Sequence, residues 1–384
     1  MRIRYWILIL LLAGGILVWR PALRLLRAVY LLLALSGQPE HGLKAVAYEV
    51  TVEPWRVEAP RGALEARLYR PRGIERPGIA VLLHGVVPQG MKDSRLVHFA
   101  RALAGGGTAV LTPDLPDIRR YLLTMATLDD IAAALETAVG SPEASWDRAR
   151  AGVVGISYSG TLGLLAASRP PLRGKLKYGV TFGSYYSFAD AVHFSLTGRY
   201  RRAGVEIDME PHPYARIVFY YNAAPEMASL EEPMRVRRVL ELMLDEQVSQ
   251  AEAARESLTP ADRRTVQAML DGDSEQLNRE VEATLSRHPD YLRAFSLEPH
   301  LPELRIPHLV LVHSANDDII PYGETVRLCR RLEPRGDLET RCVVTRLFSH
   351  VDVESGVERG FWSFTVPEYS RLIGAIYRVL TLAS

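Results

Sequence analysis

A serine that could act as a nucleophile stands at position 157, within the stretch Gly-Ile-Ser-Tyr-Ser-Gly of residues 155–160. The apolar run Ala151–Gly155 before it is typical of a buried strand, and Thr161–Ala167 after it is typical of a helix. A sharp strand-to-helix turn points a serine oxygen out of a sheet, and small residues two positions before and after it prevent backbone clashes. The pattern therefore favours Ser157 as a nucleophile. Glycine is usual where Ser159 stands, and Ser159 is a poorer nucleophile because neither of its own flanking positions holds a glycine.

A nucleophilic serine needs a base, and the base needs an acid that orients it. In the chain order serine, acid, histidine, the acid follows a later strand. The run His308–His313 predicts such a strand, and Asp317 and Asp318 lie in the turn after it. Asp317 is preferred because this acid usually stands four residues before a proline, here Pro321. Asp318 remains the neighbouring alternative, and Asp190 is a more remote one that helix capping or exposure explains better.

His350 is the candidate base, on the loop after the predicted strand Cys342–Leu347. His313 ends a strand and is expected to support the acid loop. The other candidates fit a base less well because they fall in a helical pattern, in a linker or in an insertion: His98, His41, His193, His212, His288 and His300.

Acyl transfer through a serine also requires backbone N–H groups that stabilise the developing oxyanion. The amide of Tyr158, directly after the nucleophile, is one candidate donor. The second is the amide of Val86, in the loop His84-Gly85-Val86 that follows the apolar run Gly78–Leu83. A glycine at that point lets the chain turn tightly. Ser157, Val86 and Tyr158 are therefore expected to meet at one edge of a sheet.

These segments, together with Asp317–Pro321 and Ser349-His350, resemble those of the α/β-hydrolase superfamily. The resemblance covers about residues 45–384, apart from the insertion. It implies the α/β-hydrolase fold, a triad of Ser157, Asp317 and His350, and an acyl-enzyme intermediate. It does not imply a substrate, because this fold hosts esterases, lipases, peptidases and acyltransferases.

Strand-like runs alternate with helical stretches along most of the chain, which predicts an α/β protein with a doubly wound, mostly parallel sheet. Residues 187–304 break this alternation, since their apolar residues repeat at three- and four-residue intervals. We expect a helical cap there, inserted between two parts of the core, residues 43–186 and 305–384. The aromatic stretches Tyr185–Phe188 and Val218–Tyr221 either line an apolar acyl pocket or pack within the cap. Strands are expected at Ala45–Val52 and Ala63–Tyr69, an antiparallel pair, and at Gly78–Leu83, Thr108–Leu111, Ala151–Gly155, Tyr178–Phe182, His308–His313 and Cys342–Leu347.

Residues 1–42 form a segment of their own that ends in a polar linker. Two arginines precede the apolar run Tyr5–Trp19, the layout of a signal peptide or a signal anchor. No convincing cleavage site follows this run, so a retained membrane anchor is favoured; cleavage would make the protein secreted or periplasmic. Arg20, Arg24 and Arg27 share one face of a helix, which suits a helix lying along lipid headgroups. Arginines on both sides of the run leave the side of the membrane open.

The remaining composition excludes some classes of function. A formal net charge of +1 gives no reason to expect a nucleic-acid partner. No cysteine and histidine pattern with metal-ligand spacing occurs, so neither a metal site nor another cofactor is expected. Cys329 and Cys342 flank a polar loop and could pair in an oxidising compartment, but two buried free thiols are favoured.

Three functions fit these residues. The first is hydrolysis of carboxylic esters, small or lipid-like, with apolar acyl groups and an N-terminal helix in the membrane. The second is acyl transfer to another acceptor through the same acyl-enzyme. The third is a non-catalytic membrane-bound scaffold, against which the ordered triad argues, since a scaffold has no need of Ser157 and His350 together.

Overall fold

The computed structural model describes residues 2–35, 42–202, 204–272, 274–347 and 366–383, with the backbone alone for residues 2–18. Within these ranges eight strands form one sheet in the order β1-β2-β4-β3-β5-β6-β9-β10. Only β2 runs against its neighbours, because it pairs antiparallel with β1 and β4 while the remaining pairs are parallel. The predicted doubly wound, mostly parallel sheet is confirmed. The strands are β1 (Val50–Val57), β2 (Leu64–Pro71), β3 (Gly78–Leu83), β4 (Ala109–Pro113), β5 (Asp147–Ile156), β6 (Tyr178–Phe182), β9 (His308–Ser314) and β10 (Glu339–Thr345).

Three strands begin three or more residues from their predicted start: the two edge strands and β5, which begins at Asp147 rather than Ala151. The first strand begins at Val50 rather than Ala45, because Leu43–Val46 form a 3₁₀ turn whose last carbonyl accepts a hydrogen bond from Arg27 Nε at 2.8 Å. Pro54 is accommodated in β1 because one side of an edge strand needs no N–H donor. At the other edge, β10 begins at Glu339, opposite His308, three residues before the predicted start.

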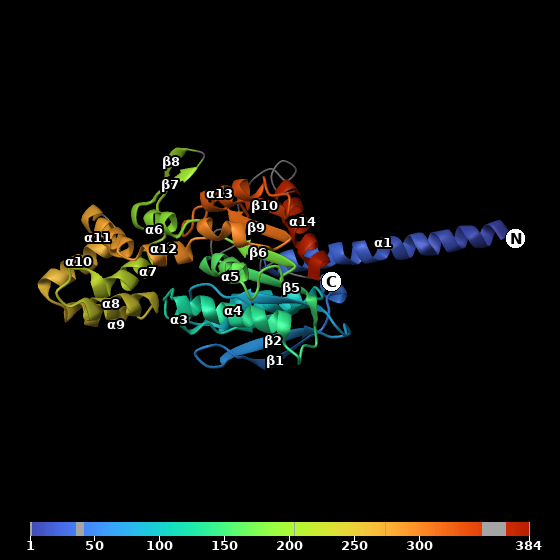
Figure 1. Ribbon diagram of the computed structural model, residues 1–384, viewed down its shortest axis with the longest axis horizontal. Helices are drawn as coiled ribbons and strands as arrows, with labels where there is room; N and C mark the ends of the chain where they lie inside the picture. Colours follow the sequence, from blue (N-terminus) through green and yellow to red (C-terminus); the bar gives the residue numbers. More distant parts are fainter. Residues whose placement is uncertain (1, 36–41, 203, 273, 348–365, 384) are drawn as a thin grey trace.

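Helices cover both faces of the sheet (Figure 1). Alternate residues of β3 enter separate apolar clusters, since Ile79, Val81 and Leu83 belong to one and Ala80 and Leu82 to the other. The first cluster is completed by α3 (Pro116–Arg119), α4 (Met125–Gly140), α5 (Tyr158–Ser168) and α13 (Gly323–Leu332). The second is completed by α1 (Arg2–Leu35), α2 (Ser94–Gly105) and α14 (Val366–Ala383).

The chain leaves the sheet between β6 and β9 and forms a separate layer of helices, which we call the cap. Figure 1 shows most of the cap helices gathered at the end of the molecule away from α1. A two-stranded hairpin around Gly204, which the helical periodicity does not predict, also belongs to this segment. The cap comprises α6 (Phe188–Thr197), β7 (Arg199–Arg202), β8 (Val205–Asp208), α7 (Pro213–Ala223), α8 (Pro233–Leu244), α9 (Val248–Glu256), α10 (Pro260–Asp271), α11 (Glu275–Ser286) and α12 (Pro289–Phe295).

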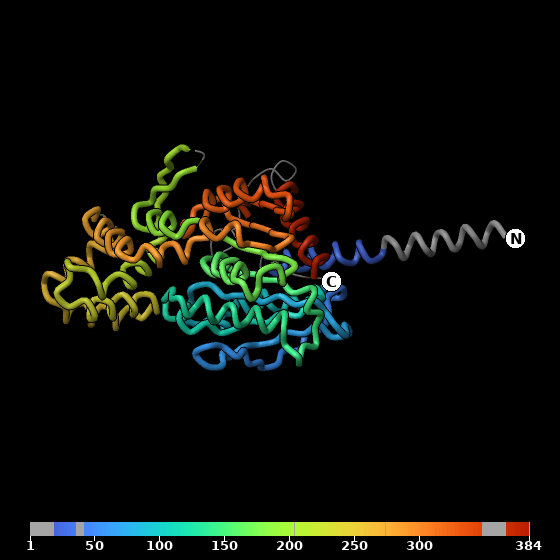
Figure 2. Tube along the Cα trace, in the orientation of Figure 1, coloured from blue at the N-terminus to red at the C-terminus, as the bar shows by residue number. Residues whose placement is uncertain are grey.

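The last half of α1 packs against the rest of the α/β fold rather than standing apart from it. Residues 19–35 contact α2 and α14, and the C-terminus lies beside this part of α1 in the trace of Figure 2. Two of the three arginines on the face expected to lie on lipid headgroups contact protein, because the guanidinium groups of Arg24 and Arg27 lie over the rings of Tyr377 and Tyr48; Arg20 is exposed. Among the described residues, no helix combines the length and hydropathy needed to cross a bilayer. The membrane anchor stays a prediction.

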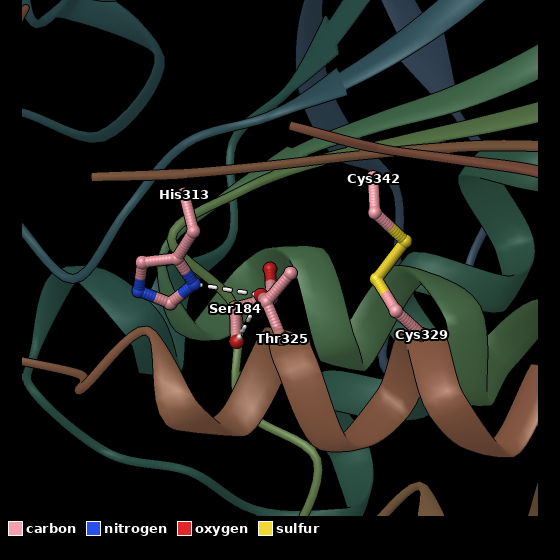
Figure 3. The surroundings of a disulfide bond; sticks show 5 residues. All are labelled: Ser184, His313, Thr325, Cys329 and Cys342. Carbon is pink, nitrogen blue, oxygen red and sulfur yellow. Dashed lines mark hydrogen bonds between the residues drawn. A yellow bond between two sulfur atoms is a disulfide. The ribbon is translucent and has the colours of Figure 1, made fainter. Parts of the chain in front are cut away.

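A disulfide joins α13 to the edge strand β10. Cys329 and Cys342 are bonded with their Cα atoms 6.4 Å apart (Figure 3), so the preference for two free buried thiols is wrong. The reason is tertiary: after the short polar loop the strand β10 returns beside α13, which brings together two residues 13 positions apart. Cys342 is exposed on the edge strand, whereas the prediction assumed burial.

We expect the C329S/C342S double variant to lose about 2–3 kcal/mol of unfolding free energy, because the crosslink restricts the unfolded chain over a short loop. Urea denaturation of both proteins measures the loss. The matched control is wild type denatured in urea with reductant present, and its unfolding free energy should equal that of the double variant. Two titratable thiols in wild type denatured without reductant would contradict the pairing.

Candidate active site

Ser157 occupies the turn between β5 and α5 in an uncommon backbone conformation. Its φ is 57° and its ψ is −135°, a region that residues with a side chain rarely adopt. The backbone N–H of Ser157 donates to the carbonyl of Phe182 on the neighbouring strand β6 at 2.7 Å. The sheet therefore supports the strained turn, which places the serine side chain at the carboxyl edge of the parallel strands.

Two glycines make this turn possible. A Cβ on Gly155 would lie 2.4 Å from the Cα of Gly160, so the strand and the helix meet without room for a side chain. A Cβ on Gly160 would lie 2.0 Å from Ser184 Oγ on the loop after β6. The usual motif has a glycine at the position of Ser159. In this chain Gly160, one position later, is the glycine that packs closely against Gly155.

Ser159, the departure from the usual motif, has its own function in the structure. Its side chain is fully buried, and its hydroxyl donates to the carbonyl of His84 at 2.5 Å. A buried hydroxyl already engaged in this bond is poorly placed to attack a substrate. The sequence predicted that Ser159 is the poorer nucleophile, but it did not reveal that Ser159 ties the turn to the loop after β3.

That loop, His84-Gly85-Val86, lies beside Ser157. A Cβ on Gly85 would be 4.0 Å from the Cβ of Ser157. The ring of His84 is buried, which lowers its pKa and keeps it neutral. Its Nδ1 lies 2.8 Å from the Gly85 carbonyl, which can only accept, and its Nε2 accepts from the Leu115 amide at 3.1 Å. The proton of the neutral ring is therefore on Nδ1.

The bond from His84 fixes the direction of the candidate oxyanion donor. The Gly85 carbonyl and the Val86 N–H belong to the same trans peptide and point in opposite directions. Holding the carbonyl on the His84 ring therefore holds the N–H away from it. Within the described parts of the chain, neither Val86 N–H nor Tyr158 N–H donates to a protein acceptor. Both amides are thus available to a negatively charged oxygen near Ser157.

A cap residue that the sequence did not single out reaches the same loop. Tyr214, near the start of α7, donates its hydroxyl to the carbonyl of Val86. Its side chain also lines the cavity in front of Ser157. The three successive carbonyls of this loop are therefore each hydrogen-bonded to a side chain. His84 O accepts from Ser159, Gly85 O from the His84 ring, and Val86 O from Tyr214. No local pattern predicts the last of these, because Tyr214 is 128 residues away in sequence.

We expect Tyr214→Phe to lower kcat for a simple ester about fivefold, since one neutral hydrogen bond contributes about 1 kcal/mol to holding the loop. KM should change little, because the ring remains in place. Tyr291→Phe is the matched control: Tyr291 also lines the cavity, but its hydroxyl donates to Leu123 at 2.8 Å, away from the loop. Equal losses of kcat in both variants would show that the bond to Val86 has no special role.

Asp317 lies at the end of β9, where the sequence predicts the acid. It is 1% exposed, and its Oδ1 accepts from the amides of Ile319 and Ile320 at 3.0 and 2.8 Å. Its Oδ2 lies 3.1 Å from Nε2 of the buried His313. These contacts fix the carboxylate in one orientation at the same sheet edge as Ser157.

His313 supports this loop, as the sequence predicts. Its Nε2 donates to the Ile320 carbonyl at 2.8 Å, and its Nδ1 lies 2.6 Å from Thr325 Oγ1. Thr325 in turn donates to the Ser184 carbonyl at 3.3 Å, so α13 and the loop after β6 join the network (Figure 3). A histidine engaged at both ring nitrogens is not placed to act as the base.

The competing acids have other surroundings. Asp318 is half-buried, and its backbone carbonyl accepts from the His212 amide of the cap at 2.8 Å. Asp190 lies in the first turn of α6 and pairs with Arg327 on the surface.

The predicted base, His350, lies outside the described residues. The strand that precedes it, β10, ends at Thr345, whose carbonyl accepts from the Ala315 amide of the acid loop at 2.6 Å.

A mostly apolar cavity of about 810 Å³ opens in front of Ser157. Its wall combines the nucleophile turn, the loop after β3, the cap, and residues of α1 and α2. Of the two aromatic stretches considered from the sequence, Phe188, Val218 and Phe219 line it, while Tyr185 and Tyr220 are buried in packing. Among the described residues, no three His, Cys, Asp or Glu side chains gather in a way that could hold a metal ion.

Comparison with known proteins supports the same fold. The profile described as the Alpha/beta hydrolase family matches residues 80–346, more than half of the chain. A search of curated proteins found no match.

Three solved structures illustrate the similarity. A hyperthermophilic esterase from Pyrobaculum calidifontis is 18% identical, with a TM-score of 0.46 over 93% of this chain and 92% of that one. Carboxyl esterase 2 from Tuber melanosporum is 15% identical, with a TM-score of 0.48 over 88% and 89%. An acylaminoacyl peptidase from Pyrococcus horikoshii is 14% identical, with a TM-score of 0.48, and this chain covers 41% of its length. On the match to the family profile, the chain belongs to the alpha/beta hydrolase family.

Proposed function

We propose that this protein is a serine hydrolase that cleaves carboxylic esters with apolar groups, with Ser157, Asp317 and His350 as its catalytic triad. The observation that carries the proposal is the surroundings of Ser157: a strained turn, two available amides and a mostly apolar cavity meet at one serine. An inert serine has no need of any of the three. An apolar cavity wall favours substrates whose acyl or alcohol group is hydrocarbon rather than charged.

In the proposed reaction His350 takes the proton from Ser157 Oγ as that oxygen bonds to the acyl carbon. The carbonyl oxygen becomes an oxyanion, which accepts hydrogen bonds from the amides of Val86 and Tyr158. The intermediate collapses, the carbon–oxygen bond to the alcohol breaks, and His350 gives its proton to that leaving oxygen. Water then attacks the acyl-enzyme with the same base, which releases the acid and restores the serine. Asp317 keeps the imidazole in the required tautomer throughout.

The test is covalent labelling combined with turnover. The purified chain is incubated with a fluorophosphonate and, separately, with p-nitrophenyl esters of increasing acyl length. We expect one adduct, located by mass spectrometry on the peptide that contains Ser157, and hydrolysis of at least one ester. A folded protein that neither labels nor hydrolyses any ester would refute the proposal. Labelling with turnover only when a second alcohol is added would favour acyl transfer instead.

Attachment to a membrane through the amino-terminal segment belongs to this proposal and rests on the apolar run Tyr5–Trp19. Separation of expressing cells into membrane and soluble fractions, followed by detection of the chain, tests it. Recovery of the full-length chain in the soluble fraction alone would remove this part of the proposal and leave the catalytic part intact.

A further inference from the structure

The last turns of α1 are built into the core. Ala28, Leu31, Leu32 and Ala34 are between 0% and 6% exposed and belong to the apolar cluster that α2 and α14 complete. Their spacing of three and four residues gives one buried stripe along the helix. Leu26 on the other side of the same helix is 42% exposed. The end of α1 therefore has a fixed orientation toward the sheet.

Polar contacts fix its position along the helix axis as well. Arg27 donates to the Val46 carbonyl at 2.8 Å, and its guanidinium lies 4.0 Å from the centre of the Tyr48 ring. At the end of the helix, the Ala34 carbonyl has no donor within the helix itself. It accepts from Nε2 of His98 on α2 at 2.9 Å. The helix end is thus attached directly to α2.

This attachment carries α1 to the cavity in front of Ser157. Ala34 and Leu35 form part of the cavity wall, next to Leu96 and Phe99 of α2. These four residues belong to or pack against the apolar cluster on one face of the sheet. The cap residues of the wall, such as Phe188 and Phe219, belong to the cluster on the other face. The cavity therefore has two apolar sides, with Ser157 at the sheet edge between them.

An ester also has two sides, because one group is attached to its carbonyl carbon and another to its ester oxygen. With the carbonyl carbon at Ser157, one group would extend toward the cap and the other toward α1 and α2. We propose that the last turn of α1, above all Leu35, determines how long a group the site accepts on that side. This inference rests on the proposed function, since it assigns the same site its selectivity.

The experiment compares full-length wild type with Leu35→Trp and Leu35→Ala. Each is assayed on p-nitrophenyl esters of acyl length two to sixteen carbons and on acetate esters of alcohols over the same range. A larger side chain in the wall should lower kcat/KM for the longest substrates of one series at least tenfold relative to the shortest, since a few methylenes of misfit cost that much. Leu35→Ala should move the preference in that series toward longer groups. The matched control is Leu26→Trp, which adds the same ring on the exposed face of the same helix and should leave both profiles unchanged.

The outcomes separate the two proposals. If wild type hydrolyses no ester and takes no fluorophosphonate, the proposed function fails. If wild type is active and both Leu35 variants keep its profile in both series, the function stands and this inference is overturned. Should Leu35→Trp fail to fold, as judged by its thermal unfolding, Leu35→Ala alone decides.

Discussion

Replacing Ser157 by alanine should abolish fluorophosphonate labelling and lower kcat for esters about 10⁴-fold or more, the loss expected when a catalytic serine is removed. The reason is that Oγ is the atom that bonds to the acyl carbon, and no neighbouring hydroxyl can replace it. Ser159 is fully buried and donates to His84. Steady-state kinetics and mass spectrometry of the probe-treated protein measure the two effects.

Ser159→Ala provides the matched control, since it removes a hydroxyl two residues away without removing the proposed nucleophile. It should still label, with kcat lowered about tenfold, because the His84 carbonyl loses its donor and the loop that presents Val86 N–H is held less firmly. The assignment would be wrong if Ser157→Ala labelled as wild type does while Ser159→Ala did not.

The second large effect is expected for Asp317→Asn, which should lower kcat about 10⁴-fold with a folded protein. An amide cannot stabilise the imidazolium that forms during attack, and it leaves the base free to adopt the wrong tautomer. The substitution also changes the contacts of this side chain. In wild type the Asp317 carboxylate accepts from the amides of Ile319 and Ile320 and faces Nε2 of His313. The NH₂ group of an asparagine cannot accept a hydrogen bond from any of these donors. Only the amide oxygen can face them, which restricts the orientation of the asparagine side chain.

Asp318→Asn distinguishes the two adjacent carboxylates, because it makes the same chemical change on a half-buried side chain. We expect its kcat to stay close to that of wild type, as measured with the same ester. A loss in Asp318→Asn combined with an active Asp317→Asn would move the role of the acid by one residue.

The sequence predicted the sharp turn at Ser157 because the geometry of that turn is local. A left-handed φ at Ser157 and the contact between Gly155 and Gly160 require small residues at fixed positions. The predicted acid loop follows the same logic, since the carboxyl ends of parallel strands meet at one edge of a sheet. Most strands of the interior were close to prediction because burial on both faces demands continuous apolar runs. The exception is β5, which begins with the polar residues 147–150 before its apolar run. The edge strands were shifted because only one side of each is paired.

Other features required the folded chain. The pairing of Cys329 with Cys342 depends on how closely β10 packs beside α13. The spacing of the two cysteines in the sequence does not give that distance. The tie from Ser159 to His84 and that from Tyr214 to Val86 join residues 75 and 128 positions apart. Their partners are backbone carbonyls, which every residue has, so no residue type marks them in advance.

The sequence by itself determined the class of the sheet and the place of the inserted segment, since both follow from periodicity, and it predicted a candidate nucleophile, acid and base from their order along the chain. Only the tertiary structure decided which groups hold the loop after β3 and which residues form the two sides of the cavity. Leu35 illustrates the difference, because in sequence it ends an apolar helix next to a linker, whereas in the fold it lies in the cavity wall with Ser157. The physical reason is that close packing brings together side chains from distant segments, and their contacts depend on the shape of the whole molecule rather than on any local pattern.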